Sequence, residues 1–173
     1  MGNDLQAEPF CTSLLHEVAD FNCGSDPWQV EVAQWIKDPS IHDCAVNWMK
    51  KGTQVWLYRT EKGELVGYGS LGKAKWNWPP PDGPSETVIL IPSFGVRDVY
   101  QGEPKEGPRE DRYAYQIMGD LIGRAQATGV QLLGLFVDPR NRRAITFYDR
   151  IGFTALSNTG NPYSRMFLEL RSS

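Results

Sequence analysis

Hydrophobic and polar positions follow a helical period and then a strand period in the first third of the chain. Apolar residues recur every three or four positions over Cys11–Asp20 and Pro27–Trp48, which predicts helices there. The next two apolar runs, Thr53–Arg59 and Leu65–Leu71, flank the polar turn Glu61–Glu64. Two short runs on either side of such a turn predict an antiparallel hairpin.

The rest of the chain alternates predicted strands with predicted helices. Three consecutive prolines remove backbone donors, so Trp76–Pro84 is predicted to be a loop of restricted shape. The elements predicted after it are a strand over Thr87–Ile91 that extends to Val96, a helix over Ala114–Ala127, a strand over Leu132–Val137, a helix capped by Asn141, and a strand over Arg165–Leu170. This order is typical of an α/β domain with a mixed sheet and a central β-α-β unit.

The segment Val137–Phe153 combines a strand end, a polar turn, an amphipathic helix and a glycine stop. Asn141 is a favourable N-cap residue, and Gly152 is placed to end the helix. Tyr148 lies on the apolar stripe of that helix, one turn before the glycine. The polar turn and the following helix are therefore predicted to start at the carboxyl end of a buried strand.

This spacing resembles the late motif of the GNAT superfamily of acetyl-CoA-dependent N-acyltransferases. The matching positions are Asn141, Ala144, Phe147, Tyr148, Gly152 and Phe153. The resemblance implies that Asn141, Ala144 and Phe147 contribute to acetyl-CoA binding, and that Tyr148 protonates the departing CoA thiolate. A phenol with a reference pKa of about 10 keeps its proton at neutral pH, which suits that role. The alternative is that Phe147 and Tyr148 only form the buried stripe of the helix.

The order of elements from about Phe21 onward also resembles the GNAT fold. The resemblance implies one domain over residues 1–173, with a mixed, mostly antiparallel twisted sheet flanked by helices. It further implies that Phe94, Gly95 and Val96 lie where the sheet opens to admit the pantetheine, and that a backbone N–H there stabilises the oxyanion. Acyl transfer by direct attack of an amine then needs no cysteine nucleophile.

The family's phosphate-binding loop has a weaker counterpart in Arg109–Ala114. The match keeps Arg109 and Ala114 and includes Tyr113, but Arg112 stands where the family has glycine. Backbone N–H groups and a helix N-terminus would hold the CoA pyrophosphate there, and the Arg112 side chain could itself pair with phosphate. A solvated helix start is the alternative. This alignment leaves an insertion over about residues 97–108, and Tyr100–Gly102 is a second candidate loop.

The acceptor side is less defined. An amine must lose a proton before it attacks a thioester, and Glu86 is the carboxylate assigned to that role, with Asp98 as the other carboxylate flanking the predicted strand. Either can instead be nothing more than a charged strand end. Trp76 and Trp78 can line an acceptor pocket through cation–π contacts, although packing or a homodimer contact would suit them equally.

Composition narrows the setting. The chain has 18 Lys and Arg against 21 Asp and Glu, a net charge of −3, which argues against a nucleic-acid-binding protein. Three cysteines without paired spacing predict reduced thiols and no metal site. No stretch approaches a membrane span and the N-terminus lacks a secretory pattern, so we expect a protein of the cytoplasm.

The predicted function is transfer of an acetyl group from acetyl-CoA to a primary amine, on a small molecule or on a larger acceptor. A second interpretation comes from a looser resemblance of the N-terminal half, Phe21–Gly24 and Gly67–Leu71 in particular, to the GNAT toxins of toxin-antitoxin pairs. Members of that group acetylate aminoacyl-tRNA, and the acidic balance of this chain speaks against a tRNA binder. A third is a module that binds acyl-CoA or a partner without catalysis, which the altered phosphate loop suggests.

Overall fold

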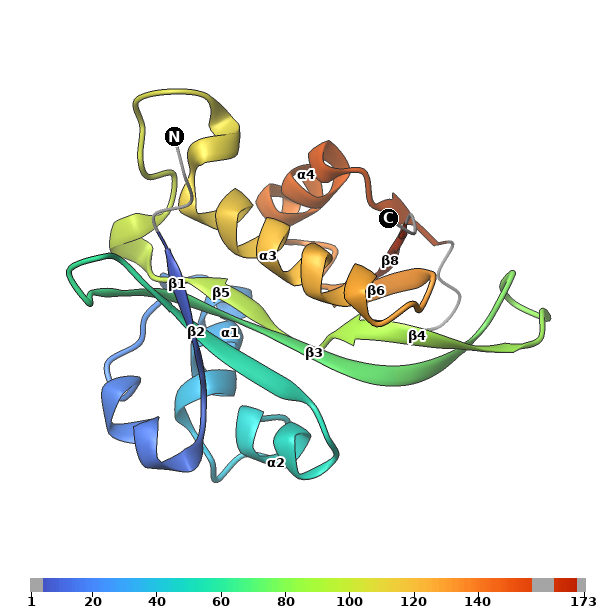
Figure 1. Ribbon diagram of the computed structural model, residues 1–173, viewed down its shortest axis with the longest axis horizontal. Coiled ribbons are helices and arrows are strands. Elements are labelled where there is room, and N and C mark those ends of the chain that lie inside the picture. The colour runs from blue at the N-terminus through green and yellow to red at the C-terminus, as the bar shows by residue number, and fades with distance from the viewer. Residues whose placement is uncertain (1–4, 157–163, 171–173) are drawn as a thin grey trace. The chain divides into compact units, whose positions relative to one another are not determined.

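The protein has an α/β fold in which helices flank a mixed sheet. A computed structural model describes residues 5–156 and 164–170. Its eight strands pair in the order β1-β2-β3-β4-β6-β8-β7, and β5 pairs with β3 off this path (Figure 1). The β4–β6 pair is parallel and the other pairs are antiparallel. The predicted mixed, mostly antiparallel sheet is therefore confirmed.

The elements have these bounds in the described residues. The strands are β1 (Gln6–Pro9), β2 (Gln54–Arg59), β3 (Leu65–Asn77), β4 (Ser85–Ile91), β5 (Phe94–Val96), β6 (Leu132–Val137), β7 (Thr154–Ala155) and β8 (Ser164–Glu169). The α-helices are α1 (Pro27–Lys37), α2 (Ala45–Lys50), α3 (Tyr113–Ala127) and α4 (Arg142–Ile151). Short 3-10 turns are η1 (Thr12–Glu17), η2 (Asp98–Tyr100) and η3 (Arg109–Asp111).

The chain divides into two compact units. The first unit contains the chain up to Leu71 together with Ser93–Leu121, and the second contains Gly72–Pro92 and the chain from Ile122. Strand β3 and helix α3 contribute residues to both.

In the first unit, α1 covers one face of the sheet around Tyr68. The ring of Trp35 stacks on the ring of Tyr68 with centroids 5.5 Å apart and planes 7° from parallel. The Tyr68 hydroxyl donates to the carbonyl oxygen of Val32 at 2.7 Å. The amphipathic stripe of the helix thus meets a buried tyrosine whose hydroxyl is bonded, which removes the cost of burying it.

The first turns of α3 pack on the opposite face of this unit. A side chain at Gly67 would place its Cβ 2.9 Å from Ile117, and one at Gly69 would come within 2.8 Å of Leu121. These two glycines therefore let the helix approach the sheet closely. The Tyr58 hydroxyl donates to Asp120 at 2.6 Å and adds a polar contact to the same packing.

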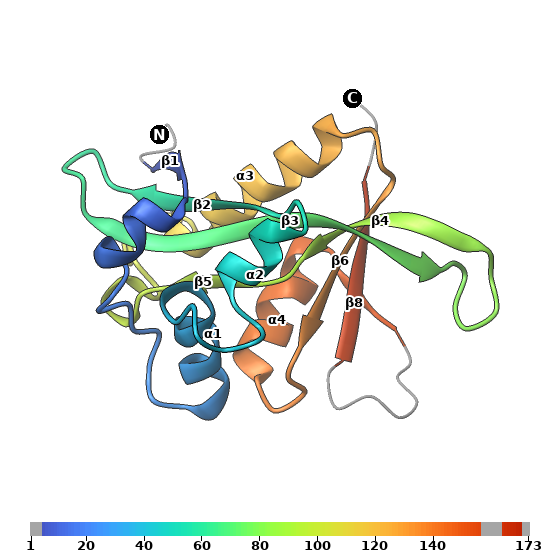
Figure 2. The same ribbon diagram turned by 90° about the horizontal axis from the view of Figure 1, so that it is seen from below.

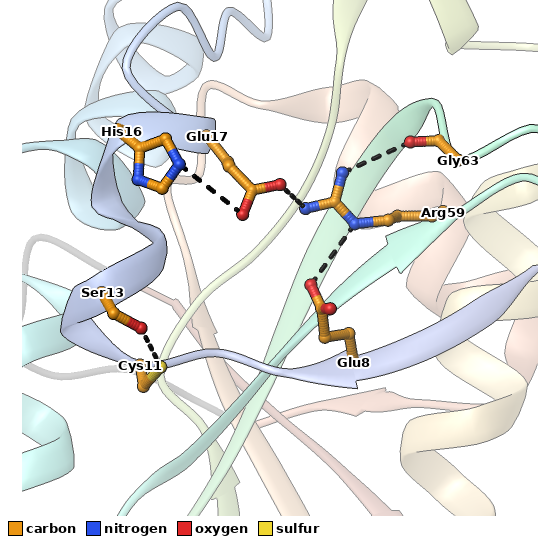
Figure 3. A network of polar contacts seen from close by, with 7 residues as sticks. All are labelled: Glu8, Cys11, Ser13, His16, Glu17, Arg59 and Gly63. Atoms are coloured by element: carbon orange, nitrogen blue, oxygen red, sulfur yellow. Dashed lines mark hydrogen bonds and ion pairs between the residues drawn. The ribbon is translucent and has the colours of Figure 1, made fainter.

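An arginine at the end of β2 connects the N-terminal segment to the hairpin (Figure 3). Arg59 lies 2.6 Å from Glu17 and 3.4 Å from Glu8, and it donates to the Gly63 carbonyl at 3.3 Å. Glu8 belongs to β1, which the sequence did not predict because QAEP is short, polar and ends in proline. Ion pairs near the surface contribute little each, so this half-buried arginine matters mainly for holding these segments in register.

In the second unit, β6 lies between β4 and β8, and α4 packs on one face (Figure 2). Leu133 and Leu135 of β6 are almost completely buried. Helix α4 ends at Gly152, whose φ of +120° suits glycine and whose Cα faces Leu168 of β8. The side chains of Leu133, Leu135 and Leu168 therefore mark the face of β6 and β8 that α4 covers.

Two predicted helices differ from the structure. The helix predicted over Pro27–Trp48 is two helices, because Pro39 cannot continue α1 and Asp38 bonds instead to the N–H and hydroxyl of Ser40. The helix predicted over Cys11–Asp20 is only the 3-10 turn η1. The loop predicted from Trp76 begins later, since β3 continues to Asn77 and Trp76 pairs with Glu86. None of the helices in the described segments is long and apolar enough to cross a bilayer.

Candidate active site

A β-bulge separates β4 from β5. Strand β3 pairs with β5 up to Gly69–Phe94 and with β4 from Gly72–Leu90 onward. Two residues of β3 separate these ladders, whereas three residues, 91 to 93, separate them on the opposite strand. One extra residue on one strand is the definition of a bulge, and bulges commonly redirect a strand beside a functional site.

The side chain of Ser70 holds this bulge. Its hydroxyl donates to the carbonyl oxygen of Ser93 at 2.6 Å and accepts from the Ser93 N–H at 3.0 Å. Ser70 is completely buried. A side chain therefore replaces the ladder hydrogen bonds that Ser93 loses where the strand is interrupted.

Strand β5 presents one edge that pairs with no strand among the described residues. The Arg97 N–H bonds to the Val66 carbonyl, so alternation turns the Val96 N–H away from β3. The Val96 carbonyl points the same way and accepts from the Gln101 side chain at 2.9 Å. The Phe94–Val96 stretch, predicted to stabilise an oxyanion, thus offers the Val96 N–H as a backbone donor. Gly95 faces the other direction, within 2.6 Å of Val32 if it carried a Cβ.

The predicted phosphate loop uses most of its backbone donors internally. The N–H groups of Asp111, Arg112 and Tyr113 bond to the carbonyls of Pro108, Arg109 and Glu103 at 3.1, 3.0 and 2.8 Å. In the described part of the chain, the Ala114 N–H has no such acceptor. The run of free N–H groups expected from the family pattern is therefore absent from Asp111 to Tyr113.

The Arg112 side chain supplies what the backbone does not. Its Nε atom is buried and has no hydrogen-bond partner among the described residues, although the residue precedes the positive end of α3. A buried guanidinium nitrogen without a partner is costly unless an anion joins it. These residues fit a phosphate group through Arg112 and the Ala114 N–H. Arg109, by contrast, is exposed on η3.

The alternative loop Tyr100–Gly102 is an anchor for the insertion. The Gln101 side chain donates to the Cys23 carbonyl at 2.7 Å as well as to Val96, and the Tyr100 hydroxyl donates to Glu64. That hydrogen bond, with burial, raises the pKa of Tyr100. Because these side chains hold neighbouring segments, the residues are not arranged as a phosphate loop.

The polar turn before α4 is already ordered. Asn141 accepts the Ala144 N–H at 3.1 Å, as its predicted capping role requires. Its side-chain amide nitrogen has no partner among the described residues and remains a donor for a ligand. Asp138 binds the Arg140 guanidinium at 2.7 and 3.0 Å, which holds the pKa of that carboxyl below its usual value.

Tyr148 is buried on α4 with its phenol chemically intact. The side chain is 8% exposed and lies edge-on to Phe147 and Phe153, with centroids 5.4 and 5.6 Å away. Burial raises the pKa of Tyr148, so the group is neutral at physiological pH. No hydrogen bond engages its hydroxyl within the described segments. The phenol can therefore donate its proton to a bound ligand.

Glu86, the carboxylate assigned as general base, lies far from the carboxyl ends of the strands. Glu86 is exposed at the second position of β4, whereas the parallel ladder with β6 runs over Ile89–Ile91 toward the carboxyl ends. Five residues of strand span about 16 Å. This placement argues against Glu86 as the base. Asp98 is exposed, and its carboxylate accepts the Val99 N–H.

The two tryptophans predicted for the acceptor side are packed against the second unit's sheet. Trp76 is almost buried, with its ring over Gly134 and the Arg165 guanidinium 5.3 Å from its centroid. Trp78 meets the ring of Phe167 edge-on at 4.6 Å. Because the protein's own groups lie against Trp76, its ring is not an open wall for a substrate amine.

Sequence reasoning did not identify the role of Ser70 at the bulge, and it placed Gln101 in a candidate phosphate loop rather than in an anchoring contact. A serine inside the apolar run of β3 and a glutamine in a polar loop carry no local signal for these roles. The described residues contain no cluster of His, Cys, Asp and Glu that could hold a metal ion.

The comparison with solved structures identifies the fold. No protein-family model matches the sequence, and no curated protein matches it either. Among solved structures, a Tyr-to-Phe mutant of the AtaT toxin bound to the C-terminus of the antitoxin AtaR and acetyl-CoA is 13% identical, with a TM-score of 0.71 over 96% of this chain and 94% of the other. The KacTA–DNA complex is 14% identical, with a TM-score of 0.68 over 96% and 93%. An acetyltransferase of the GNAT family from Staphylococcus aureus is 12% identical, with a TM-score of 0.61 over 96% and 99%. The chain has the GNAT fold.

Proposed function

We propose that the protein is an acetyltransferase that moves an acetyl group from acetyl-CoA to a primary amine. The observation that carries this proposal is Tyr148, a buried neutral phenol whose hydroxyl is unengaged within the described residues. It lies on the helix that Asn141 caps at the carboxyl end of β6. The GNAT fold supports this proposal by analogy with other proteins of the same fold.

Each residue has a separate task in the proposed reaction. Acetyl-CoA supplies an activated thioester. The Arg112 side chain and the Ala114 N–H bind its phosphates, the Asn141 amide donates to its pantetheine arm, and the Val96 N–H donates to the thioester oxygen as negative charge develops there. Tyr148 gives its proton to the leaving sulfur, while the amine loses a proton to water or to an unassigned base.

The first test is calorimetric titration of the protein with acetyl-CoA and with CoA, followed by a turnover assay on a broad amine panel. We expect saturable binding, at least tenfold weaker in Arg112→Ala and unchanged in Arg150→Ala, an exposed arginine on α4. Turnover of any amine supports acetyl transfer. Absence of binding by the wild type contradicts the proposal, and binding without turnover of any acceptor favours the non-catalytic module.

A second candidate function is acetylation of aminoacyl-tRNA. The specific observation in its favour is the division of charge between the two units. The second unit carries nine Lys and Arg against five Asp and Glu, whereas the first carries nine against sixteen. An acidic chain can thus keep a basic region suited to phosphates. Addition of the protein with acetyl-CoA to a cell-free translation reaction tests this: inhibition supports it, and full translation with acetylation of small amines contradicts it.

A further inference from the structure

One face of the second unit's sheet is aromatic and lies opposite the face that α4 covers. Leu168 packs toward Gly152 at the end of α4. Because side chains alternate along β8, Phe167 and Arg165 point to the other side of the sheet. Register places Gly134 opposite Phe167 and Phe136 opposite Arg165. These residues, with Trp76 above Gly134, form what we call the aromatic face.

Gly134 gives the aromatic face its shape. A Cβ at this position would lie 2.4 Å from the Trp76 ring, so only glycine lets the indole rest directly on β6. Phe136 then meets the indole edge-on at 5.8 Å. The indole is thereby held in one position between β6 and the Phe136 ring, and a binding surface benefits from side chains held rigidly in this way.

Arg165 is a cation on this face with no acidic partner. Its guanidinium lies 5.3 Å from the Trp76 centroid, and no carboxylate lies within 4.0 Å of it among the described residues. A guanidinium stacked on an indole keeps its planar edge of N–H donors for another group. That fork matches a carboxylate, which can accept two parallel hydrogen bonds.

Phe136 provides an apolar neighbour for the same ligand. It is 43% exposed, whereas Leu135 and Val137 on either side are buried. It lies one residue before the last position of β6, next to the turn that leads to Asn141. An exposed ring beside an unpaired cation suits a ligand with a ring and an anionic group, because edge-to-face aromatic contact and a charge-assisted bond can form together.

We infer that the aromatic face binds the acyl acceptor, and that this acceptor is an amine carrying an aromatic ring and a carboxylate. The ring packs on Phe136 and the carboxylate pairs with Arg165. This inference rests on the proposed acetyltransferase function. It adds a class of acceptor and two residues that select it.

The test compares two product-like ligands that differ only in the carboxylate, N-acetylphenylalanine and N-acetylphenethylamine, by calorimetry. We expect the wild type to bind the carboxylate at least tenfold more tightly. Arg165→Gln should remove that preference while Arg150→Gln keeps it, and Phe136→Ser should weaken both ligands alike. Circular dichroism confirms that each variant is folded.

The inference is overturned by no binding of either ligand, by the same preference in the wild type and Arg165→Gln, or by a dimer that Phe136→Ser dissociates. Adenosine monophosphate that binds more tightly than both ligands, and loses affinity in Arg165→Gln, would assign the face to a nucleotide instead. The turnover assay tests the proposed function separately. Carboxylate-selective binding with no turnover supports the aromatic face as a binding site and contradicts acetyl transfer. Turnover without Arg165-dependent selectivity supports acetyl transfer and contradicts the role of the aromatic face.

Discussion

Two buried tyrosines, one in each unit, differ in the fate of the hydroxyl. The Tyr68 hydroxyl donates to the Val32 carbonyl at 2.7 Å and lies 2.5 Å from the hydroxyl of Ser93. Tyr148 is similarly buried, yet its hydroxyl has no hydrogen bond within the described part of the chain. A buried polar group normally has partners because their absence is costly. The difference is consistent with a structural role for Tyr68 and with the proposed role of Tyr148 as a proton donor to a ligand.

Tyr148→Phe tests this difference most strongly. Loss of a general acid lowers rates by about 100-fold or more, so we expect kcat to fall by at least that factor. Acetyl-CoA affinity should stay the same, and the free energy of unfolding should change little, because no protein hydrogen bond is lost. Steady-state kinetics and urea titration measure the two effects. An unchanged kcat would show that Tyr148 is not the acid.

Ser70→Ala should have the next largest effect. The Ser70 hydroxyl bonds to the backbone of Ser93 in the bulge, and the Ser93 hydroxyl is in turn a partner of Tyr68. The Ser93 N–H and carbonyl would both lose their partner in a buried place, which costs about 1–3 kcal/mol of unfolding free energy. The bulge also sets where the Val96 N–H points, so we expect weaker acetyl-CoA binding as well. Chemical denaturation and calorimetry measure these changes. Wild-type stability in this variant would mean that water or a shifted backbone replaces the serine.

Tyr68→Phe should affect stability but not chemistry. The variant loses the hydrogen bonds of the hydroxyl to the Val32 carbonyl and to the Ser93 hydroxyl, and with them about 2 kcal/mol of unfolding free energy. The kcat of the folded protein should remain at the wild-type value. The outcome that breaks the comparison is a kcat loss in Tyr68→Phe as large as in Tyr148→Phe.

Cys23 gives a pH-dependent effect that is absent at neutral pH and develops only in alkaline solution. Burial, followed by the nearby Asp98 charge, raises the pKa of this thiol from 9.0 to about 12. The unfolded chain then releases the proton first, so stability is full below about pH 9 and declines as the pH rises toward 12. Cys23→Ala should flatten this alkaline decline in thermal melts, whereas Cys11→Ala, at an exposed thiol, should not.

The sequence predicted most of the fold because the long elements carry clear periodicity. The β2–β3 hairpin, α3, β6, α4 and the Asn141 cap follow from apolar spacing and capping chemistry, and the structure contains them all. The gaps arise where tertiary contacts decide. Trp76 continues β3 because its ring has a place over Gly134, which is distant in sequence, and β1 exists because β2 offers an edge.

The candidate site was less predictable from sequence. The Asn141 and Tyr148 positions follow from a local motif, but donor availability depends on the whole loop. Tyr113 bonds to Glu103, ten residues earlier, and no local pattern reveals that the donor is occupied. Likewise, the contact of Arg165 with the Trp76 ring depends on strand order. The sequence therefore suggested that Trp76 lines an acceptor pocket, whereas the structure places the Arg165 guanidinium against its ring.

Strand order also has a consequence during synthesis. Strand β6, with the sequence LLGLFV, has β8 as its second neighbour over six paired residues, and β8 emerges from the ribosome 27 residues after β6 ends. At about 5–20 residues per second, the nascent chain exposes an apolar, unpaired strand edge for a few seconds. Newly made molecules therefore pass through a stage at which chaperone binding and aggregation compete with completion of the sheet.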